Sequence, residues 1–317
     1  MILSLIIYRR QNKKFNMALT VHKSVLLNEV IESMNLKEGD IVFDGTLGGG
    51  GYSEEILKKI GESGILIGTD LDSAAHKKVN KRLEKYKTQK YFFQKNYSQI
   101  SEILEELNIE KIDSATLDLG ISSDQLEEIQ RGISFKNLDN PLDMNLTDNE
   151  ELKKLTASEI LNEWDEESIA DIIFYYGDER AAKKIASAVI KKRKTKPFEK
   201  VKDLVDLLED EIGYFYKHKK IHPSTKTFQA LRITVNDEMG NLKTALKDVI
   251  KNIKTRGRFS VVTFHSLEDR ITKKIFKEFE EEGLIKRVNK KVIKPSEEEL
   301  KENPRARSAK LRIVEIL

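Results

Sequence analysis

The chain of 317 residues contains no cysteine and only five histidines. Without cysteine, disulfides, thiolate catalysis and thiolate metal sites are all excluded. The histidines are scattered along the sequence, so we predict no metal site. No apolar run is long enough to cross a bilayer. We therefore expect a cytoplasmic protein that does not insert into a membrane.

Charge of one sign is not in excess either. The chain has 56 basic and 53 acidic residues, so its average charge does not indicate a partner. The length predicts two compact units. In residues 1–20 a short apolar stretch precedes the basic residues, which is the reverse of a signal peptide. We interpret these residues as an N-terminal extension.

Apolar runs and helical periodicity alternate in the part of the chain that follows. This alternation indicates a parallel sheet with helices on both faces. Strands are predicted at residues 41–44, 64–70, 91–96 and 112–120, and helices at 22–34, 53–60, 73–86 and 98–107.

The alternation stops after the fourth strand. Between about residues 122 and 235 we find only helical patterns, at 158–176, 179–193, 201–212 and 227–235. The sheet pattern then resumes with a helix at 237–254, a strand at 258–266, a helix at 267–281 and an antiparallel pair at 284–293 and 308–316. We expect Gly257 to end the first of these helices. The sequence therefore predicts an α/β domain, residues 21–125 and 236–317, with an all-helical insertion, 126–235, that recognises the substrate.

A glycine-rich loop is the first candidate site. Four consecutive glycines, Gly48 to Gly51, lie shortly after Asp44 and before a predicted helix. A strand, a glycine loop and a helix in this order let backbone N–H groups approach a cofactor closely. Asp70 and Asp118 end two further predicted strands. Because ligands bind beyond the carboxyl ends of parallel strands, we expect these acids to share one site.

Two cofactors compete for such a loop. A dinucleotide-binding G-x-G-x-x-G motif would need its third glycine at Ser53, and the Lys-Ser/Thr pair of a Walker loop is absent. Asp44, inside the first strand, suits a cofactor that carries an amino group, which favours S-adenosylmethionine. An NAD-dependent oxidoreductase is one alternative, and a non-catalytic RNA-binding factor that retains a cofactor fold is another.

Ten blocks of the sequence resemble the RsmH/MraW family of ribosomal RNA methyltransferases. In family order they are HKSVLLNEV, FDGTLGGGGYS, GTDLD, LDLGISSDQL, RGISF, PLDM, YGDERAAKKIA, HPSTKTFQALRITVN, FHSLEDR and NPRARSAKLR. The resemblance implies a Rossmann-like class I methyltransferase that uses S-adenosylmethionine to methylate N4 of a specific cytidine in the decoding region of 16S ribosomal RNA. The implied partner is small-subunit ribosomal RNA or the assembled 30S subunit, and the oligomeric state is left open.

The resemblance also implies which residues bind the cofactor. They are Gly50, Gly51 and Tyr52 in the loop, Asp70 for the ribose, Tyr97 for the adenine, and Asp118 and Gln125. Three positions depart from the family pattern. Tyr52 replaces a histidine, Asn145 an arginine and Ile133 a phenylalanine. Roles that need an imidazole or a guanidinium at these positions are therefore not transferred.

Asp118 is the catalytic candidate. Many amino-methyltransferases carry an Asn/Asp-Pro-Pro-aromatic motif after the fourth strand, but no proline follows Asp118 here. We expect its carboxylate to accept a hydrogen bond from the amine of the base or from the amino group of the cofactor. The cytidine must be unpaired or extruded to reach such a pocket.

Three other segments have both a structural and a functional interpretation. HPSTKTFQALR is either a capped helix that packs through its apolar residues or a substrate contact made by Lys226, Gln229, Arg232 and Asn236. FHSLEDR, with His265, is either a helix cap or an active-site wall, and we favour the wall. The basic residues of 183–202 and of NPRARSAKLR are either solvated or phosphate-binding, and we favour RNA. Trp164 is interpreted as a core residue of the insertion.

Overall fold

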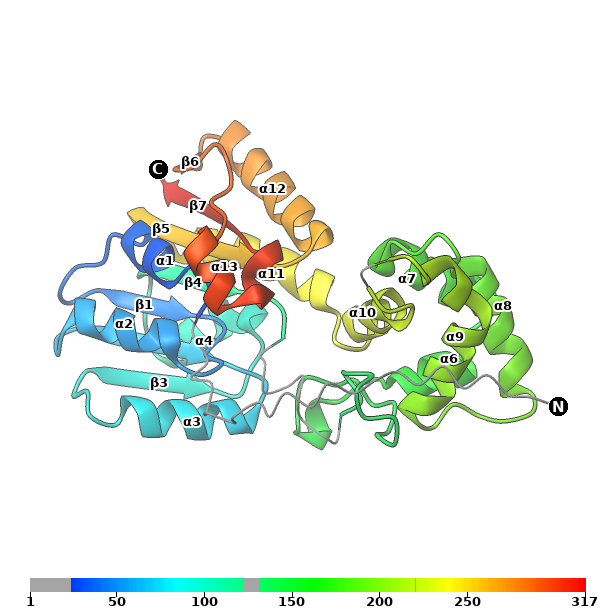
Figure 1. Cartoon of the computed structure of the whole chain (residues 1–317). Coiled ribbons are helices and arrows are strands. Elements are labelled where there is room, and N and C mark those ends of the chain that lie inside the picture. Colours follow the sequence, from blue (N-terminus) through cyan, green and yellow to red (C-terminus); the bar gives the residue numbers. More distant parts are fainter. Residues whose placement is uncertain (1–23, 122–130, 220) are drawn as a thin grey trace.

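The computed structural model describes residues 24–121, 131–219 and 221–317. Figure 1 shows a sheet half with helices on both faces and a bundle of helices beside it. The predictions for residues 1–20 and for Gln125 lie outside the described residues. Within the described ranges, no helix combines the length and the apolar character needed to span a bilayer.

Seven strands form one sheet in the order β3-β2-β1-β4-β5-β7-β6. They are β1 Ile41–Asp44, β2 Ile65–Thr69, β3 Gln89–Phe93, β4 Ile112–Asp118, β5 Ile253–Thr263, β6 Ile285–Arg287 and β7 Lys310–Ile316. The first five are parallel, and β7 is antiparallel to β5 and β6. The predicted parallel sheet and closing antiparallel pair are confirmed. The chain moves outward from β1 to β3 and then places β4 on the other side of β1, which creates a topological switch point where open sheets bind ligands.

Apolar side chains on both faces of the sheet form two cores. Val42 and Phe43, successive residues of β1, point to opposite faces and belong to different cores. The Val42 face is covered by α1 Leu27–Ser33, α2 Gly51–Ile60 and α3 Ser73–Leu83, and the Phe43 face by α4 Ile100–Glu106, α11 Glu238–Asn252 and α12 Ser266–Glu281. Shorter segments are η1 Tyr97–Gln99, η2 Glu150–Leu152, α13 Glu297–Glu302 and η3 Pro304–Ser308.

The strand β5 begins earlier than its sequence pattern predicts. The helix α11 ends at Asn252 and Ile253 already belongs to β5, so the prediction that Gly257 ends this helix was wrong. The pairing of β5 with β4 shifts register at this point. A Cβ added to Gly257 would come within 2.3 Å of the Asp113 carbonyl oxygen. The glycine therefore permits a close approach of two strands.

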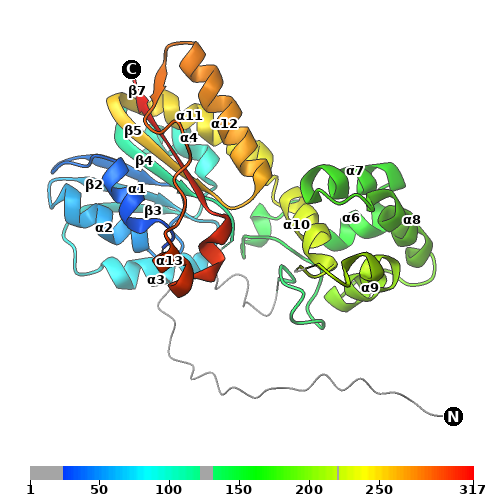
Figure 2. The same ribbon diagram turned by 45° about the horizontal axis from the view of Figure 1, so that its top comes forward.

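The helical insertion has a core of its own. Its helices are α6 Ala157–Glu163, α7 Glu166–Gly177, α8 Ala182–Arg193, α9 Val201–Tyr216 and α10 Ser224–Val235. The single predicted helix at 158–176 was wrong, because the chain is extended at Trp164 and the Asp165 side chain caps α7 by accepting from the Ser168 N–H at 2.8 Å. Trp164 packs against the insertion core. In Figures 1 and 2, α10 is the helix of the insertion that faces the sheet half.

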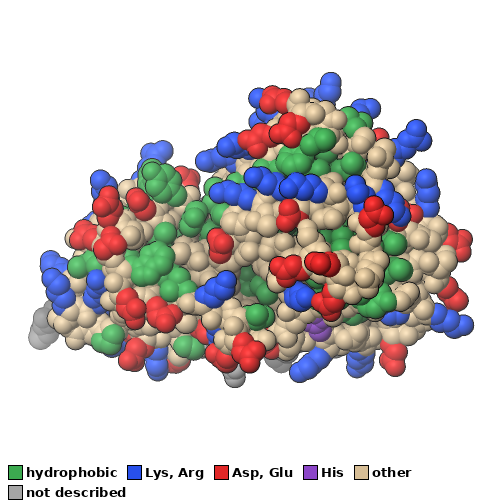
Figure 3. Space-filling model, turned by 180° about the vertical axis from the view of Figure 1, so that it is seen from behind, with side chains coloured by type: hydrophobic (Ala, Val, Ile, Leu, Met, Phe, Trp, Pro, Cys, Tyr) green, Lys and Arg blue, Asp and Glu red, His purple; other side chains and the backbone are tan. Residues whose placement is uncertain are grey.

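Several basic residues of the 183–202 segment are used inside the insertion. Arg193 donates to the carbonyl oxygens of Leu161, at 3.2 Å, and Trp164, at 2.6 Å, at the end of α6. Lys192 and Lys196 both bond to Asp203. Lysines, arginines and acids are interspersed over the face shown in Figure 3. The predicted role of this segment in RNA binding therefore cannot be assigned to Arg193, which closes a helix.

Replacing Arg193 with alanine should destabilise the helical insertion by about 1–3 kcal/mol, because two carbonyl oxygens at the end of α6 lose their donor. Lys194→Ala, at an exposed neighbouring position, is the matched control and should change stability little. Urea unfolding followed by tryptophan fluorescence checks this, since the sole tryptophan, Trp164, lies in the insertion. Equal midpoints for the two variants would contradict the assignment.

Asp44 fixes the start of the glycine loop. Its side chain is fully buried at the end of β1. One carboxylate oxygen accepts from the Ser53 hydroxyl at 2.6 Å and the other from the Thr46 N–H at 3.2 Å. These bonds join β1, the loop and the first turn of α2, which begins at Gly51, two residues before its predicted start. Burial raises the pKa of Asp44 to about 6.

The stability contributed by Asp44 should depend on pH. Its folded-state pKa is raised from 3.8 to about 6, so its contribution is complete at low pH and is lost as pH rises through about 6. Asp44→Asn carries no such loss and should gain up to roughly 3 kcal/mol relative to the wild type between about pH 4 and pH 7. Urea titrations across this range, with the exposed Asp139→Asn as control, measure the difference. A pH-independent difference would show that Asp44 does not titrate as described.

Candidate functional site

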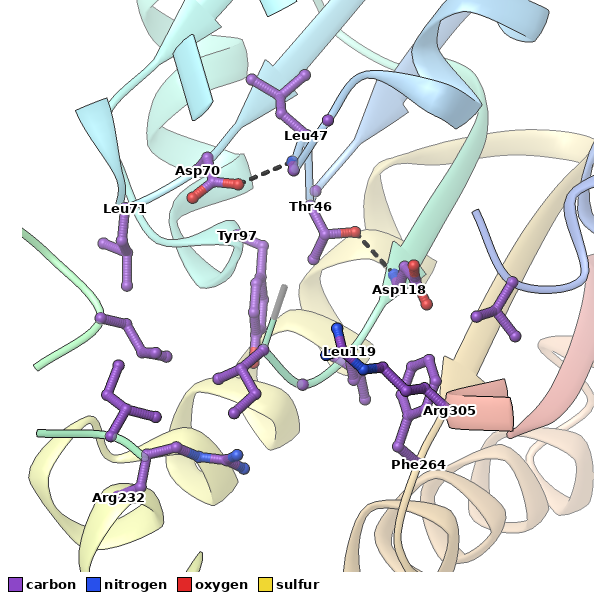
Figure 4. Close-up of a pocket in the computed structure, with 18 of the residues that line it drawn as sticks. Thr46, Leu47, Asp70, Leu71, Tyr97, Asp118, Leu119, Arg232, Phe264 and Arg305 are labelled. Atoms are coloured by element: carbon purple, nitrogen blue, oxygen red, sulfur yellow. Dashed lines mark hydrogen bonds between the residues drawn. The ribbon is translucent and has the colours of Figure 1, made fainter. Parts of the chain in front are cut away.

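A cavity of about 520 Å³ lies at the carboxyl ends of the parallel strands. Figure 4 shows residues from the sheet half and from the insertion facing one another across it. The β1–α2 loop, the ends of β2, β4 and β5, and the segment after β3 form one side. The helix α10 and the irregular chain before the insertion form the other side. The cavity therefore lies at the switch point and is closed by the insertion.

Asp70 holds the glycine loop in place from the next strand. One of its carboxylate oxygens accepts from the Gly48 N–H at 2.9 Å (Figure 4), and the other accepts from the Asp72 N–H at 3.0 Å. Burial raises the pKa of Asp70, although these two N–H groups act to lower it. Asp70 lies on the cavity wall, as the sequence predicted, and it also shapes the loop.

The glycines themselves divide between the wall and the layer behind it. Gly48 and Gly49 line the cavity. Gly50 precedes α2 with φ of 75°, in the left-handed region that favours glycine, and a Cβ on Gly51 would come within 2.0 Å of the Ser24 hydroxyl oxygen. Gly50 and Gly51 thus shape the turn, and their contact with a cofactor stays a prediction.

Tyr52 is almost completely buried and lines the cavity. Its hydroxyl donates to the Val25 carbonyl oxygen and so ties α2 to the segment before α1. Burial raises its pKa well above the usual range. The hydroxyl is therefore a fixed structural donor, at a position where the sequence departs from the pattern that the resemblance implies.

Tyr97 enters the cavity from the segment after β3. The Asn96 side chain accepts from the Ser98 N–H at 2.9 Å and begins the short helix η1, which directs the Tyr97 ring into the cavity (Figure 4). Burial, and then the Glu238 carboxylate, raise the pKa of the Tyr97 hydroxyl. The ring provides an aromatic wall, and its contact with adenine stays a prediction.

Asp118 ends β4 and faces the same cavity. Its backbone N–H donates to the Thr46 hydroxyl at 2.7 Å (Figure 4). Its buried Oδ1 has no hydrogen-bond partner among the described residues. Burial raises the pKa of Asp118 well above its usual range, and neighbouring carboxylates, Asp44 first among them, raise it further. This carboxyl group therefore lacks a cationic or hydrogen-bonding partner within the described protein.

The insertion supplies polar groups to the opposite wall. Arg232 and Gln229 of α10 line the cavity. The Gln229 amide donates to the Tyr176 carbonyl oxygen at 2.9 Å, and Arg232 is paired with Glu238 at 2.7 Å. Lys226, on the same helix, instead donates to the Asp178 carbonyl oxygen outside the cavity. On α10, Gln229 and Arg232 therefore reach the cavity, whereas Lys226 supports packing.

Glu238 and Glu268 form a buried charged cluster behind the cavity. The ligand atoms of Glu238, His265 and Glu268 lie within 4.8 Å of one another, which is close enough for a metal ion. Glu238 is already paired with Arg232, and Glu268 contacts His265 at 2.9 Å and accepts from the Phe264 N–H at 2.7 Å. Burial would raise the pKa of Glu268, but its hydrogen bonds and positive neighbours keep it lowered. The cluster is explained by these pairs, and the expected lack of a metal stays a prediction.

His265 has both of the roles that the sequence left open. It lines the cavity and it is the N-cap of α12, with Glu268 completing a capping box. In the NPRARSAKLR segment, Arg305 lines the cavity, whereas Lys310 and Arg312 each pair with Asp269 at 2.8 Å. The phosphate-binding interpretation therefore does not apply to those two residues as they stand.

Some cavity residues were not predicted from the sequence. Phe135 and Leu146 line the side formed by the insertion. Phe135 is stacked on His222, with ring centroids 4.7 Å apart. Phe135 and Leu146 lie in an irregular segment without periodicity. The RGISF motif was the only available signal for Phe135. Asn145, another position that departs from the pattern the resemblance implies, is buried and donates to Asp143 at 2.8 Å, so it has a structural role.

Comparison with known proteins identifies the family of this chain. The model of the MraW methylase family matches residues 19–317. Ribosomal RNA small subunit methyltransferase H of Brevibacillus brevis is 40% identical over 93% of this chain and 98% of its own, and that of Dictyoglomus thermophilum is 44% identical over 93% and 97%. A crystal structure of a putative rRNA-methylase from Clostridium thermocellum matches over 93% of this chain and 98% of its own, with a TM-score of 0.44 and 12% identity. The chain belongs to the MraW methylase family.

Proposed function

We propose that this protein transfers a methyl group from S-adenosylmethionine to N4 of a cytidine in the decoding region of small-subunit ribosomal RNA. The observation that supports this most is the match to a methylase family over residues 19–317, with relatives named as small-subunit ribosomal RNA methyltransferases. The cavity at the sheet switch point supports it independently, because its volume of about 520 Å³ is in the range of small-molecule sites.

The residues present fit such a cofactor. Asp118 offers a buried carboxylate oxygen without a partner among the described residues, which suits the amino group or the sulfonium charge of the cofactor. Asp70 and Tyr97 both line the cavity, and we expect Asp70 to accept from ribose hydroxyls and the Tyr97 ring to pack on the adenine. When bound, S-adenosylmethionine supplies an electrophilic methyl group.

The protein's own residues would position the base and handle its proton. The N4 amine of cytosine is a poor nucleophile because its lone pair is delocalised into the ring, so alignment and a hydrogen-bond acceptor both matter. Asp118, once ionised, is the acceptor we propose near the amine or the cofactor's amino group. The wall formed by Phe135, Gln229 and Arg232 would hold the extruded base and exclude water.

The substrate would be the small-subunit RNA, either free or in the assembled subunit, and the protein would act in the cytoplasm, where that RNA is found. Purified protein incubated with labelled S-adenosylmethionine and undermethylated small subunits should label one cytidine at N4. Naked RNA from the same particles is the second arm and decides between the two substrate forms. Mapping the modified base by mass spectrometry checks atom and position. Absence of label from both arms would overturn the proposed function.

Cofactor binding should release a proton from Asp118. A cation favours the ionised carboxylate, so binding lowers the raised pKa of Asp118, and affinity should increase as pH rises towards that pKa. Asp118→Asn should bind more weakly and abolish most of the proton release. Calorimetry in buffers with different ionisation enthalpies measures the released protons, with Asp139→Asn as a control outside the cavity. Wild-type binding without proton release would contradict the assignment.

A further inference from the structure

Four large aromatic side chains are exposed on the helical insertion. Phe174 and Tyr175 at the end of α7 are 50% and 66% exposed, and Tyr214 and Phe215 at the end of α9 are 84% and 56% exposed. These four are the exposed large aromatics of the described ranges, and none lies on the sheet half, whose exposed large apolar residues are aliphatic. We call these four residues the aromatic surface.

The two pairs lie at neighbouring helix ends. The hydroxyl of Tyr216, the last residue of α9, donates to Glu179 in the connection between α7 and α8. Lys184 of α8 donates to the Glu211 carbonyl oxygen and lies 5.8 Å from the centroid of the Phe215 ring. These contacts hold the end of α9 against the turn that follows α7. The aromatic pairs therefore flank one junction of three helices.

Basic side chains surround this junction. The exposed cations at the start of α8 and just after α9 are Arg180, Lys183, Lys184, Lys217 and Lys219. The Lys219 ammonium lies 4.0 Å from the centroid of the Tyr216 ring. Acids lie among these cations. Asp171, Asp178, Glu209 and Asp210 are exposed, Lys184 is paired with Glu211 at 3.2 Å, and Lys226 lies 4.0 Å from Asp178. Exposed rings among cations match the chemistry of unpaired nucleic acid, whose bases stack on aromatic faces and whose phosphates are negative.

The aromatic surface is joined to the cavity through α10. Gln229 lines the cavity and donates to the carbonyl oxygen of Tyr176, the residue after Tyr175. Lys226, one turn earlier on α10, donates to the Asp178 carbonyl oxygen. The end of α7 is thus held directly behind a helix that forms the cavity wall. An RNA strand that enters the cavity past α10 would therefore continue towards the end of α7.

We propose that the aromatic surface binds the unpaired RNA strand that flanks the target cytidine, by stacking bases on its rings while nearby lysines contact phosphates. This inference rests on the proposed function and names the part of the insertion that holds the substrate. The aromatic rather than aliphatic composition, and exposed cations next to the rings such as Lys184 beside Phe215, favour RNA over a second copy of the chain.

Two double variants test the surface, Phe174→Ala with Tyr175→Ala and Tyr214→Ala with Phe215→Ala. Each should weaken binding of a single-stranded RNA oligonucleotide carrying the target cytidine and its flanks at least tenfold, since each stacked base contributes about 1–3 kcal/mol. The KM for undermethylated subunits should rise while kcat and S-adenosylmethionine affinity stay unchanged. Tyr214→Phe with Phe215→Tyr keeps two rings and should retain binding.

The control is Leu284→Ala with Val288→Ala, an exposed aliphatic pair on the sheet half that should leave RNA binding unchanged. Trp164 fluorescence confirms that each variant is folded. If the wild type binds and methylates RNA and both aromatic variants match it, the surface is not an RNA contact. Loss of subunit binding with normal RNA binding indicates a protein partner, and a change only in oligomeric state indicates a second copy; either result overturns the proposal. A wild type that neither binds nor methylates RNA instead overturns the proposed function.

Discussion

Two carboxylates at the ends of adjacent strands, the buried Asp44 and the half-buried Asp70, hold the loop on which the cavity depends. Asp44 accepts from the Thr46 N–H and the Ser53 hydroxyl, and Asp70 accepts from the Gly48 N–H. Burying these acids has a desolvation cost, which the hydrogen bonds offset in part and which leaves the pKa of each raised. A loop of glycines has little conformational preference of its own. Its shape therefore comes from the acids around it, and the same acids bring negative charge to the cavity.

A second constraint fixes the insertion against the sheet half. Arg232 of α10 forms a two-pronged pair with Glu238 of α11, with distances of 2.7 and 3.0 Å. Asn236, between these helices, accepts from the Leu146 N–H and donates to the Met144 carbonyl oxygen. A two-pronged pair fixes the relative orientation of its two side chains, and removing one partner would leave the other charge buried and unpaired. The distance between the two walls of the cavity is therefore set by polar contacts of defined direction.

The sequence predicts the elements whose signals are local and leaves out those that arise from tertiary contacts. Strand-end acids could be expected to converge, because parallel strands place their carboxyl ends at one edge, and Asp70 and Asp118 do meet at the cavity. The break before Asp165 was missed because both flanking segments are helical, although Asp165 is itself a helix-capping residue. Gly257 was misread because its close neighbour, the Asp113 carbonyl, is distant in sequence. Phe135 could not be placed, since it lies in an irregular segment without a period.

The distribution of charge along the cavity also distinguishes between S-adenosylmethionine and a dinucleotide, the two cofactors that the glycine loop alone left open. Asp70 and Asp118 face the cavity, and Asp44 lies just behind it. Two of the cations that line the cavity are already paired, Arg232 with Glu238 and Lys95 with Glu106 at 2.9 Å, and Arg305 lines it as well. A pyrophosphate would bring further negative charge to these carboxyl groups and raise their pKa values further. A sulfonium and an ammonium group would lower them, which is why these buried acids favour S-adenosylmethionine over a dinucleotide.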